Sequence, residues 1–512
     1  MRTGRKIWKI MIATMLLVPL FAGGLSAFAE TETSPPTVET ADVTLHKRVF
    51  KDKLDTGYPK ENTGLEDENF GGMPLAGAGF TVYNVTDAYH AALVGKTQAE
   101  AIAAVLALHE ATPPTVFPIA KAEQLTMDPG GKTTFTGLSL KSGDKDAAYL
   151  FVETTTPDSP TIVEKAAPFI LAMPIYTAKD KTGELNKDIH VYPKNISAES
   201  TKELLDPADP LPPFGKVTID GKEYPNVQIG DTLKYKLTIQ IPTDIAKKSS
   251  FVILDRPGAG MALANPANPV DPANPANIKV EGLTRDTDYT LRTSADGKEL
   301  DIALIMTSEK VKALAGTALI ITYDMVLTED AVPDTVIEND ATIKINGETT
   351  TEMTPKGVVT GGKQFIKKDG HTGKALAGAK FKVTNGTKWA KFTVNAAEEN
   401  AFAGWVAEAD ATEVEAGTDG TFKVIGLLKG GYSLKETFTP TGYVPLTDLF
   451  SFTVTVPGYG STEALRPTVP NVPKGLLPST GGTGIYAFLA IGSMMMLGAY
   501  IWFKRSKEQA EV

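Results

Sequence analysis

The chain has 512 residues, of which 61 are acidic and 51 are basic, so its formal net charge is −10. This charge disfavours nucleic acids and anionic membrane surfaces as partners. The sequence contains no cysteine, which excludes disulfides, cysteine-ligated metal sites and cysteine nucleophiles. The five histidines show no H-x-x-x-H or similar pairing, so we expect no metal site and no cofactor.

The first 29 residues are typical of a secretory signal peptide. Four basic residues precede a mostly apolar stretch at 10–25, and Ala27 and Ala29 supply the small side chains that a signal peptidase requires. We therefore expect export and cleavage after Ala29. An uncleaved N-terminal anchor is the alternative.

Between the two terminal signals, short alternating strands are separated by turn residues. Roughly 450 residues remain there, enough for about three domains. This pattern predicts an all-β fold of tandem immunoglobulin-like β-sandwich domains. The predicted divisions are a signal peptide at 1–29, an N-terminal domain at 30–200, a middle domain at 201–352, a C-terminal domain at 353–474, and a terminal segment at 475–512.

The first module begins with an alternating strand at 43–50 that places Lys47 on its core-facing side. A buried lysine is costly unless it is paired or neutral. The alternative is an edge lysine whose aliphatic stem lets the amine reach water. Further along, the alanine-rich stretch 88–110 predicts a helical insertion.

An internal repeat relates the first module to the last. Residues 75–84 and 376–385 share the pattern L-A-G-A-x-F-x-V-x-N. Each copy continues to a strand on which a tyrosine and a glutamate share a face, Tyr149 with Glu153 and Tyr432 with Glu436. The repeat predicts two copies of one module.

The middle module follows a stretch at 198–213 that is rich in Pro, Asp and Glu and predicts a linker. The module is expected to start at 214–217 and the third module near 361–367, which ends near 469–471. The strands predicted for the middle module are 233–242, 251–255, 318–323 and 336–345, with a loop at 262–277.

The C-terminus combines three signals. The pentapeptide Leu477, Pro478, Ser479, Thr480, Gly481 precedes an uncharged apolar run of 20 residues, Gly484–Phe503, and then a basic tail. A helix of that length spans about 30 Å, which predicts a transmembrane helix with a cytoplasmic tail. The pentapeptide resembles the LPxTG sorting signal of Gram-positive surface proteins, which a sortase cuts between Thr and Gly. A plain tail anchor is the alternative.

Two further motifs extend this resemblance to the whole chain. Tyr192-Pro193-Lys194-Asn195 resembles the pilin motif, and the Tyr-x-x-x-Glu-Thr segments resemble E-boxes, although the segment of Glu153 lacks the closing Gly-Tyr. The chain thus resembles the backbone (major) pilins of sortase-assembled Gram-positive pili, with CnaB-like outer domains and a CnaA-like middle domain.

The resemblance implies a structural shaft subunit that is secreted, retained transiently at the membrane and anchored to the cell wall. In that family the lysine of the pilin motif attacks the acylated threonine of another subunit, here Lys194 and Thr480. The implied partners are identical subunits, a sortase, minor tip and base pilins, peptidoglycan and host extracellular matrix, with a role in adhesion. No nucleic acid is expected.

The resemblance also implies internal Lys–Asn isopeptide bonds, each promoted by an acid. Burial favours the neutral, nucleophilic lysine and the protonated acid, which can shuttle protons while ammonia leaves. The expected sets are Lys47–Glu153–Asn195, Lys216–Asp255–Asn339 and Lys367–Glu436–Asn471. Lys222, Lys363 and Lys368 are rival lysines, and salt-bridged pairs without a covalent bond are the alternative to cross-links.

We expect no enzyme that acts on other molecules. The nucleophile elbow G-x-S-x-G is absent from the sequence, and the only expected chemistry is single-turnover self-modification. The alternative function is a monomeric cell-wall-anchored adhesin, which would share the modules and the sorting signal and would not need Lys194.

Overall fold

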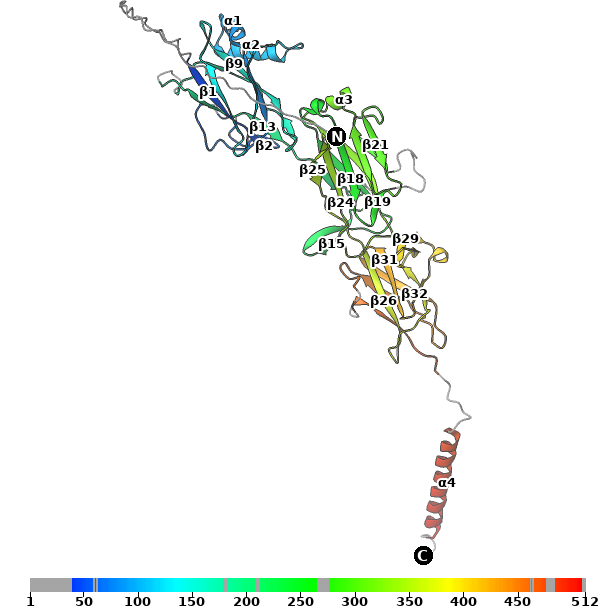
Figure 1. The fold of residues 1–512 in the computed structure, drawn as a ribbon. Coiled ribbons are helices and arrows are strands. Elements are labelled where there is room, and N and C mark those ends of the chain that lie inside the picture. The colour runs from blue at the N-terminus through cyan, green and yellow to red at the C-terminus, as the bar shows by residue number, and fades with distance from the viewer. Residues whose placement is uncertain are drawn as a thin grey trace, which may run out of the picture.

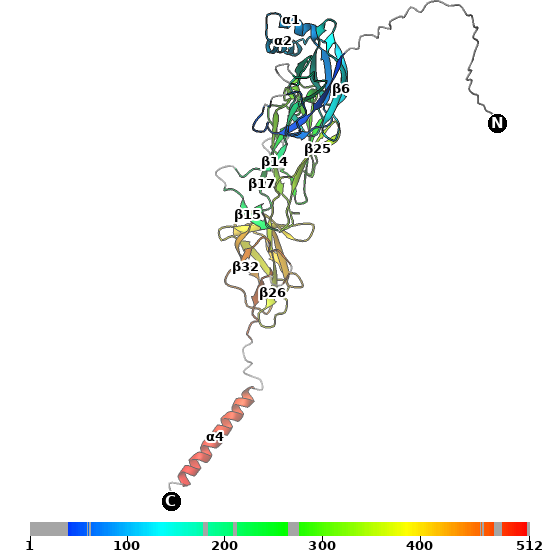
Figure 2. The same ribbon diagram turned by 90° about the vertical axis from the view of Figure 1, so that its left-hand side faces the viewer.

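The chain is elongated and mostly β, which confirms the predicted fold class (Figure 1). The computed structural model describes residues 39–58, 60, 63–177, 183–207, 212–264, 276–460, 462, 465–475 and 484–508. Three β-rich bodies follow one another from the blue end to the orange end, and a separate helix follows them (Figures 1 and 2). The predicted signal peptide and the sorting pentapeptide, including Thr480, lie outside the described residues.

The N-terminal body contains three small sheets. In the first, β1 (Thr40–His46) lies between β12 (Asp188–Val191), which is parallel to it, and β6 (Lys132–Ser139), which is antiparallel. The second has the order β11 (Phe169–Ala172), β9 (Ala148–Thr155), β4 (Gly79–Asn84), β5 (Ile119–Leu125). The third has the order β10 (Ile162–Glu164), β13 (Lys194–Ser197), β2 (Arg48–Lys51), β3 (Met73–Pro74).

The core of this body is built by the alternation of its strands. Val43, Leu45, Phe80 and Phe135 are fully buried and pack in one cluster. The predicted strand at 43–50 is present but divided, because the chain leaves β1 at His46 and enters β2 at Arg48. Lys47 occupies the break between them.

The predicted helical insertion is confirmed as two helices, α1 (Thr86–Leu93) and α2 (Gln98–Glu110), at the top of Figure 1. Thr97 begins α2 with a capping box, in which its hydroxyl accepts from the Glu100 amide and the Glu100 carboxylate accepts from the Thr97 amide. The helices share a small apolar cluster with β9 around Val105, separate from the main core. The short hairpin β7 (Lys141–Ser142) and β8 (Lys145–Asp146) lies between β6 and β9 in the sequence.

The middle body contains two five-stranded sheets that share one apolar core. One sheet has the order β14 (Thr201–Leu204), β17 (Thr232–Gln240), β23 (Ala318–Leu327), β19 (Met261–Leu263), and β20 (Lys279–Val280) pairs with β23. The other has the order β21 (Tyr289–Thr293), β22 (Leu300–Leu304), β18 (Phe251–Pro257), β24 (Asn339–Ile345), β25 (Glu348–Met353). The short helices η1 (Ile245–Lys247) and α3 (Glu309–Lys312) and the hairpin β15 (Gly215–Ile219) with β16 (Lys222–Asn226) complete the body.

The predicted linker at 198–213 is wrong in its first half. β14 pairs with β17 there, and Lys202 lies opposite Leu237. Thr201 and Glu203 face solvent while the Lys202 side chain is buried. The strand was missed because its inward residue is a lysine, so the alternation of apolar and polar residues was hidden.

The C-terminal body is a single sheet with the order β33 (Phe450–Val454), β32 (Gly430–Phe438), β27 (Lys380–Thr384), β28 (Trp389–Val394), β29 (Asn400–Val406), β31 (Thr421–Leu427), β26 (Gly361–Asp369), β34 (Thr468–Asn471). β30 (Val414–Glu415) pairs with β27, and η2 (Glu408–Asp410) precedes it. Phe422 stacks between Phe365 and Phe381 in the core. The apolar core is continuous with that of the middle body.

The last described element is α4 (Gly484–Glu508), the red helix in Figure 1. Within the part of the chain that the structure describes, no helix is both long enough and apolar enough to cross a membrane. The predicted transmembrane helix at Gly484–Phe503 is therefore not confirmed.

Candidate cross-link and linkage sites

The N-terminal body brings Lys47, Glu153 and Asn195 together as the sequence predicted. The side chains of Lys47 and Glu153 are fully buried, and the Lys47 amine donates to Glu153 Oε2 at 2.8 Å and to Asn195 Oδ1. The Asn195 amide donates to Glu153 Oε1 at 2.8 Å. Burial lowers the pKa of Lys47 from 10.5 to about 8, although the Glu153 charge opposes the shift. The amine is thus much closer to its neutral form than an exposed lysine.

A backbone amide completes this site. The Ala166 N–H donates to Asn195 Oδ1 at 2.7 Å and to Glu153 Oε2 at 3.1 Å. A donor fixed on the Asn195 carbonyl oxygen stabilises the negative charge that develops there when an amine attacks the carbon. Sequence reasoning missed Ala166, because a main-chain donor leaves no signal in the residue type.

The C-terminal body brings Lys367, Glu436 and Asn471 together in the same way, with a different set of contacts. Lys367 Nζ lies 3.4 Å from Glu436 Oε1, and both side chains are fully buried. The Asn471 amide donates to Glu436 Oε2 at 3.1 Å and to the Val444 carbonyl at 2.8 Å. Among the described residues, Lys367 Nζ, Glu436 Oε1 and Asn471 Oδ1 are buried without a hydrogen-bond partner. Burial lowers the pKa of Lys367.

The two outer sites share one strand register. In the N-terminal body, Asn195 lies opposite Val49 on a parallel neighbour, two residues after Lys47. In the C-terminal body, Asn471 lies opposite Asp369, again two residues after Lys367 and again on a parallel neighbour. The internal repeat found in the sequence therefore corresponds to a repeated geometry.

The middle body places Lys202, and not Lys216, beside Asp255. The Lys202 amine contacts Asp255 Oδ2 with both side chains buried, and it lies 5.0 Å from the Tyr235 ring centre and 5.7 Å from that of Tyr323. The Tyr323 hydroxyl donates to the same carboxylate oxygen. Burial lowers the pKa of Lys202 to about 8 and raises the pKa of Asp255.

Asn339 is fully buried on β24, which pairs with the Asp255 strand so that Asn339 lies opposite Pro257. Both polar atoms of its carboxamide lack a hydrogen-bond partner among the described residues. Such an amide is costly to bury, since its hydrogen bonds to water are lost without replacement.

The sequence-based choice of Lys216 is wrong. Lys216 lies on the hairpin of β15 and β16, its side chain is 69% exposed, and it lies 3.7 Å from Glu223. The rival Lys222 is exposed on the same hairpin. The sequence signal that could have identified the buried lysine beside Asp255 is the middle position of the short Thr-Lys-Glu-Leu strand, which Lys202 occupies.

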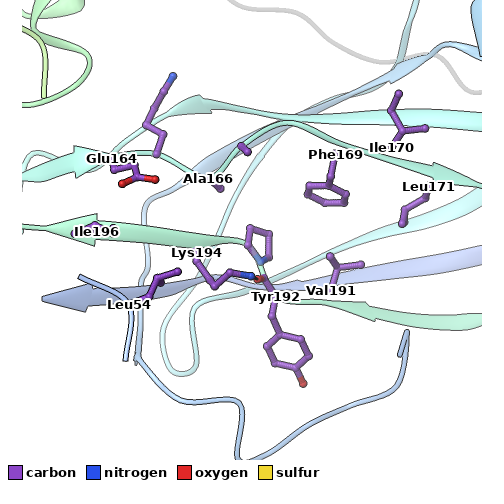
Figure 3. Close-up of a pocket in the computed structure, with 13 residues that line it drawn as sticks. Leu54, Glu164, Ala166, Phe169, Ile170, Leu171, Val191, Tyr192, Lys194 and Ile196 are labelled. Atoms are coloured by element: carbon purple, nitrogen blue, oxygen red, sulfur yellow. Dashed lines mark hydrogen bonds between the residues drawn. The ribbon is translucent and has the colours of Figure 1, made fainter. Parts of the chain in front are cut away.

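Lys194 begins β13, directly after the two-residue interruption that follows β12 (Figure 3). This strand pairs in parallel with β2, and Lys194 lies opposite Arg48. The side chain is half-buried, its amine donates to the Tyr192 carbonyl at 3.4 Å, and it lies 5.3 Å from the Phe70 ring centre. Burial lowers the pKa of Lys194.

A groove of about 450 Å³ runs beside this lysine, as Figure 3 shows. Its lining is mostly apolar and includes three charged residues, Glu164, Lys165 and Lys194. The apolar lining residues are Leu54, Phe169, Ile170, Leu171, Val191 and Ile196. An extended, mainly apolar peptide would fit such a surface.

Comparisons with known protein families match three parts of the chain. Residues 38–196 match the family described as Gram-positive pilin subunit D1, N-terminal domain. Residues 361–465 match the prealbumin-like fold domain SpaA, and residues 470–511 match the LPXTG cell wall anchor motif.

Curated relatives are fimbrial subunits of Actinomyces. The chain is 25% identical to fimbrial subunit type 2 of Actinomyces naeslundii over 93% of this chain and 91% of the relative. It is 27% identical to fimbrial subunit type 1 of Actinomyces viscosus over 54% of this chain, an alignment that spans less than half (45%) of that relative.

Among solved structures, the full-length RrgB pilus protein of Streptococcus pneumoniae is 18% identical with a TM-score of 0.49, over 86% of this chain and 99% of that one. The matching domains, the wall-anchor motif and the fimbrial relatives together lead to one assignment. The chain belongs to the LPXTG-anchored pilins of Gram-positive bacteria and is a structural subunit of a cell-surface pilus.

Proposed function

We propose that the chain is the shaft subunit of a covalent pilus, in which a sortase joins Thr480 of one subunit to Lys194 of the next. The sortase cysteine replaces Gly481 on the Thr480 carbonyl as a thioester. The neutral Lys194 amine then attacks that carbonyl, an amide forms, and the cysteine leaves as a thiol. Minor tip and base pilins, and adhesion to host matrix, belong to the same proposal.

The observation that carries this proposal is the environment of Lys194. A half-buried amine with a lowered pKa is easier to deprotonate than an exposed lysine. The adjacent apolar groove provides a place for Leu477 and Pro478 of the incoming sorting signal. The acceptor lies in the N-terminal body and the sorting signal follows the C-terminal body, so the contact is head-to-tail and builds an open fibre (Figure 1).

The test compares Lys194→Ala with Lys165→Ala, a matched control at another lysine that lines the same groove. Cell-surface material is boiled in denaturant and separated by size. We expect a ladder of covalent multimers from the wild type and from Lys165→Ala, and only single subunits from Lys194→Ala. A ladder that persists in Lys194→Ala would assign the linkage to another amine, and single subunits from the wild type would leave a solitary wall protein.

We further propose internal isopeptide bonds between Lys47 and Asn195, Lys202 and Asn339, and Lys367 and Asn471. In each reaction the neutral amine attacks the Asn carbonyl carbon, an amide forms, and the side-chain nitrogen leaves as ammonia. Glu153, Asp255 and Glu436 take the amine proton and return one to the leaving nitrogen. The domains assigned to these bonds are 30–200, 201–352 and 353–474.

Intact mass spectrometry tests these bonds one at a time. The mature chain should be lighter than its sequence by three molecules of ammonia. Replacing one asparagine by alanine should remove one of the three losses, while the other two remain as internal controls. A chain with its full calculated mass would overturn all three assignments.

A further inference from the structure

Two histidines that lie far apart in the sequence meet beside the pilin motif. The parallel pairing of β1 with β12 places Thr44 opposite His190, so His46 at the end of β1 lies next to it. His46 Nε2 is 2.7 Å from His190 Nδ1, and Glu66 Oε1 is 3.9 Å from His46 Nε2. These three ligand atoms all lie within 4.8 Å of one another. The sequence spacing of the histidines had predicted no such cluster.

The cluster has graded access to solvent. The side chain of His46 is 1% exposed, that of His190 is 14% exposed, and that of Glu66 is 46% exposed. A buried ligand fixed by the fold, a partly buried second ligand and an exposed carboxylate together form a site that is anchored on one side and open on the other. An ion can therefore enter from the Glu66 side.

An outer carboxylate supports the metal-binding tautomer of His190. Its Nε2 lies 3.4 Å from Asp188 Oδ2, so the ring can donate its Nε2 proton there and keep a lone pair on Nδ1. Metal-ligating histidines usually have a carboxylate or carbonyl on the other ring nitrogen. The Asp188 contact is independent of the three ligand distances.

We propose that His46, His190 and Glu66 form a binding site for a divalent transition-metal ion of the zinc class, with water in the fourth position. Two imidazole nitrogens and one carboxylate suit Zn²⁺, whereas Ca²⁺ and Mg²⁺ prefer oxygen ligands throughout. With Zn–N bonds of about 2.0–2.1 Å in tetrahedral geometry, the two nitrogens must separate to about 3.3 Å. His46 moves its proton from Nε2 to Nδ1, so no net proton is released.

One nearby cation must move when a metal binds. The Lys132 amine lies 2.8 Å from Glu66 Oε1, and the metal would replace this amine as the partner of the carboxylate. The Lys132 side chain is 47% exposed, so it can turn into solvent at little cost.

A stack of aromatic rings connects the proposed metal site to Lys194. Tyr192 stacks on His46 with a centroid distance of 4.6 Å and, at 4.3 Å, on Phe70, whose ring faces the Lys194 amine. The Tyr192 hydroxyl accepts from the Asp67 amide. A metal held by Glu66 would thus fasten the segment 63–72 to β1 and β12. Only this consequence for Lys194 depends on the proposed pilus linkage.

The experiment measures Zn²⁺ binding to the purified full-length chain after treatment with a chelator. Calorimetric titration should give one saturable site per chain, and Co²⁺ should give the visible absorption of a tetrahedral site. Zinc should also raise the unfolding temperature of the N-terminal domain. His190→Gln and Glu66→Gln should lose the site, and Asp188→Asn should bind about 10–100-fold more weakly.

His371→Gln, an exposed histidine of the C-terminal body, is the matched control and should bind as the wild type does. Unfolding of His190→Gln without metal shows whether that variant is folded. Absence of saturable binding to the wild type, or unchanged binding by a folded His190→Gln chain, would overturn the proposal. These readouts do not use polymerisation, so a failure of the Lys194 linkage would leave them unaffected.

Discussion

The middle domain and the two outer domains bring the same kinds of residue together in different ways. In the outer domains the asparagine lies on a strand parallel to β26, which contains Lys367, or to β2, which directly follows Lys47, and the two-residue offset is the same. In the middle domain Lys202 belongs to the sheet of β14, whereas Asp255 and Asn339 belong to the opposite sheet. The proposed cross-linking chemistry therefore requires a buried amine, acid and amide, and it does not require one topology.

The difference has a mechanical consequence for the proposed cross-links. A bond between the first and last strands of an outer domain would carry tension past the rest of that domain. A bond between the two sheets of the middle domain would oppose their separation. In each case the load passes through covalent bonds in place of strand hydrogen bonds, which are individually worth about 1 kcal/mol.

The largest expected effect tests the lysine of the middle domain. Lys202→Met should remove one ammonia loss. It should also lower the free energy of unfolding of that domain by about 4–5 kcal/mol, because the proposed bond between Lys202 and Asn339 closes a loop of more than 100 residues. The unpaired Asp255 left behind adds to the loss. Lys216→Met is the control and should stay within about 0.5 kcal/mol of the wild type. The reverse result, with Lys216 required for the ammonia loss, would restore the sequence-based assignment.

The next effect distinguishes the two outer domains, which differ in the donor on the asparagine oxygen. Ala166→Pro removes the N–H that contacts Asn195 Oδ1. Loss of one such donor should slow bond formation in the N-terminal domain by about 10²–10³-fold. The time course of ammonia loss after synthesis measures this rate, and the bonds of the other two domains serve as internal controls. Unchanged kinetics in a folded variant would show that the acid alone activates Asn195.

These sites show what a single sequence can and cannot predict. The Lys47 and Lys367 sites were predictable, because the family resemblance implies both sets of residues and the internal repeat places a glutamate on the matching strand of each copy. Lys202 was missed because its strand is short and lies in a stretch with the composition of a linker. His46 and His190 were missed for a different reason. They are 144 residues apart, and their contact depends on the register between β1 and β12, which no local spacing in the sequence reveals.

A smaller effect concerns the pH dependence of the middle domain without its bond. In Asn339→Ala, Lys202 remains buried, and its pKa is lowered from 10.5 to about 8. Between these values the unfolded chain binds a proton that the folded chain does not, so stability should rise with pH, by on the order of 1–3 kcal/mol. Denaturant unfolding at pH 8 and pH 10 measures the rise. The double variant Lys202→Met with Asn339→Ala should not become more stable between pH 8 and pH 10. An equal rise in the double variant would mean that other groups cause the pH dependence.

The smallest effect concerns how the acid is held in the C-terminal domain. The Thr439 hydroxyl donates to Glu436 Oε2 at 2.7 Å, and the Leu446 amide donates to the same oxygen at 2.8 Å. Thr439→Val keeps the shape and removes one hydrogen bond, so the domain should lose about 1 kcal/mol while its ammonia loss remains. Thr437→Val, an exposed neighbour on β32, is the control. If Thr439→Val also prevented the ammonia loss, the hydroxyl would be needed to orient Glu436. The two outer domains would then differ in a further way, since Glu153 is held by the backbone amide of Ala166, which only a proline at that position removes.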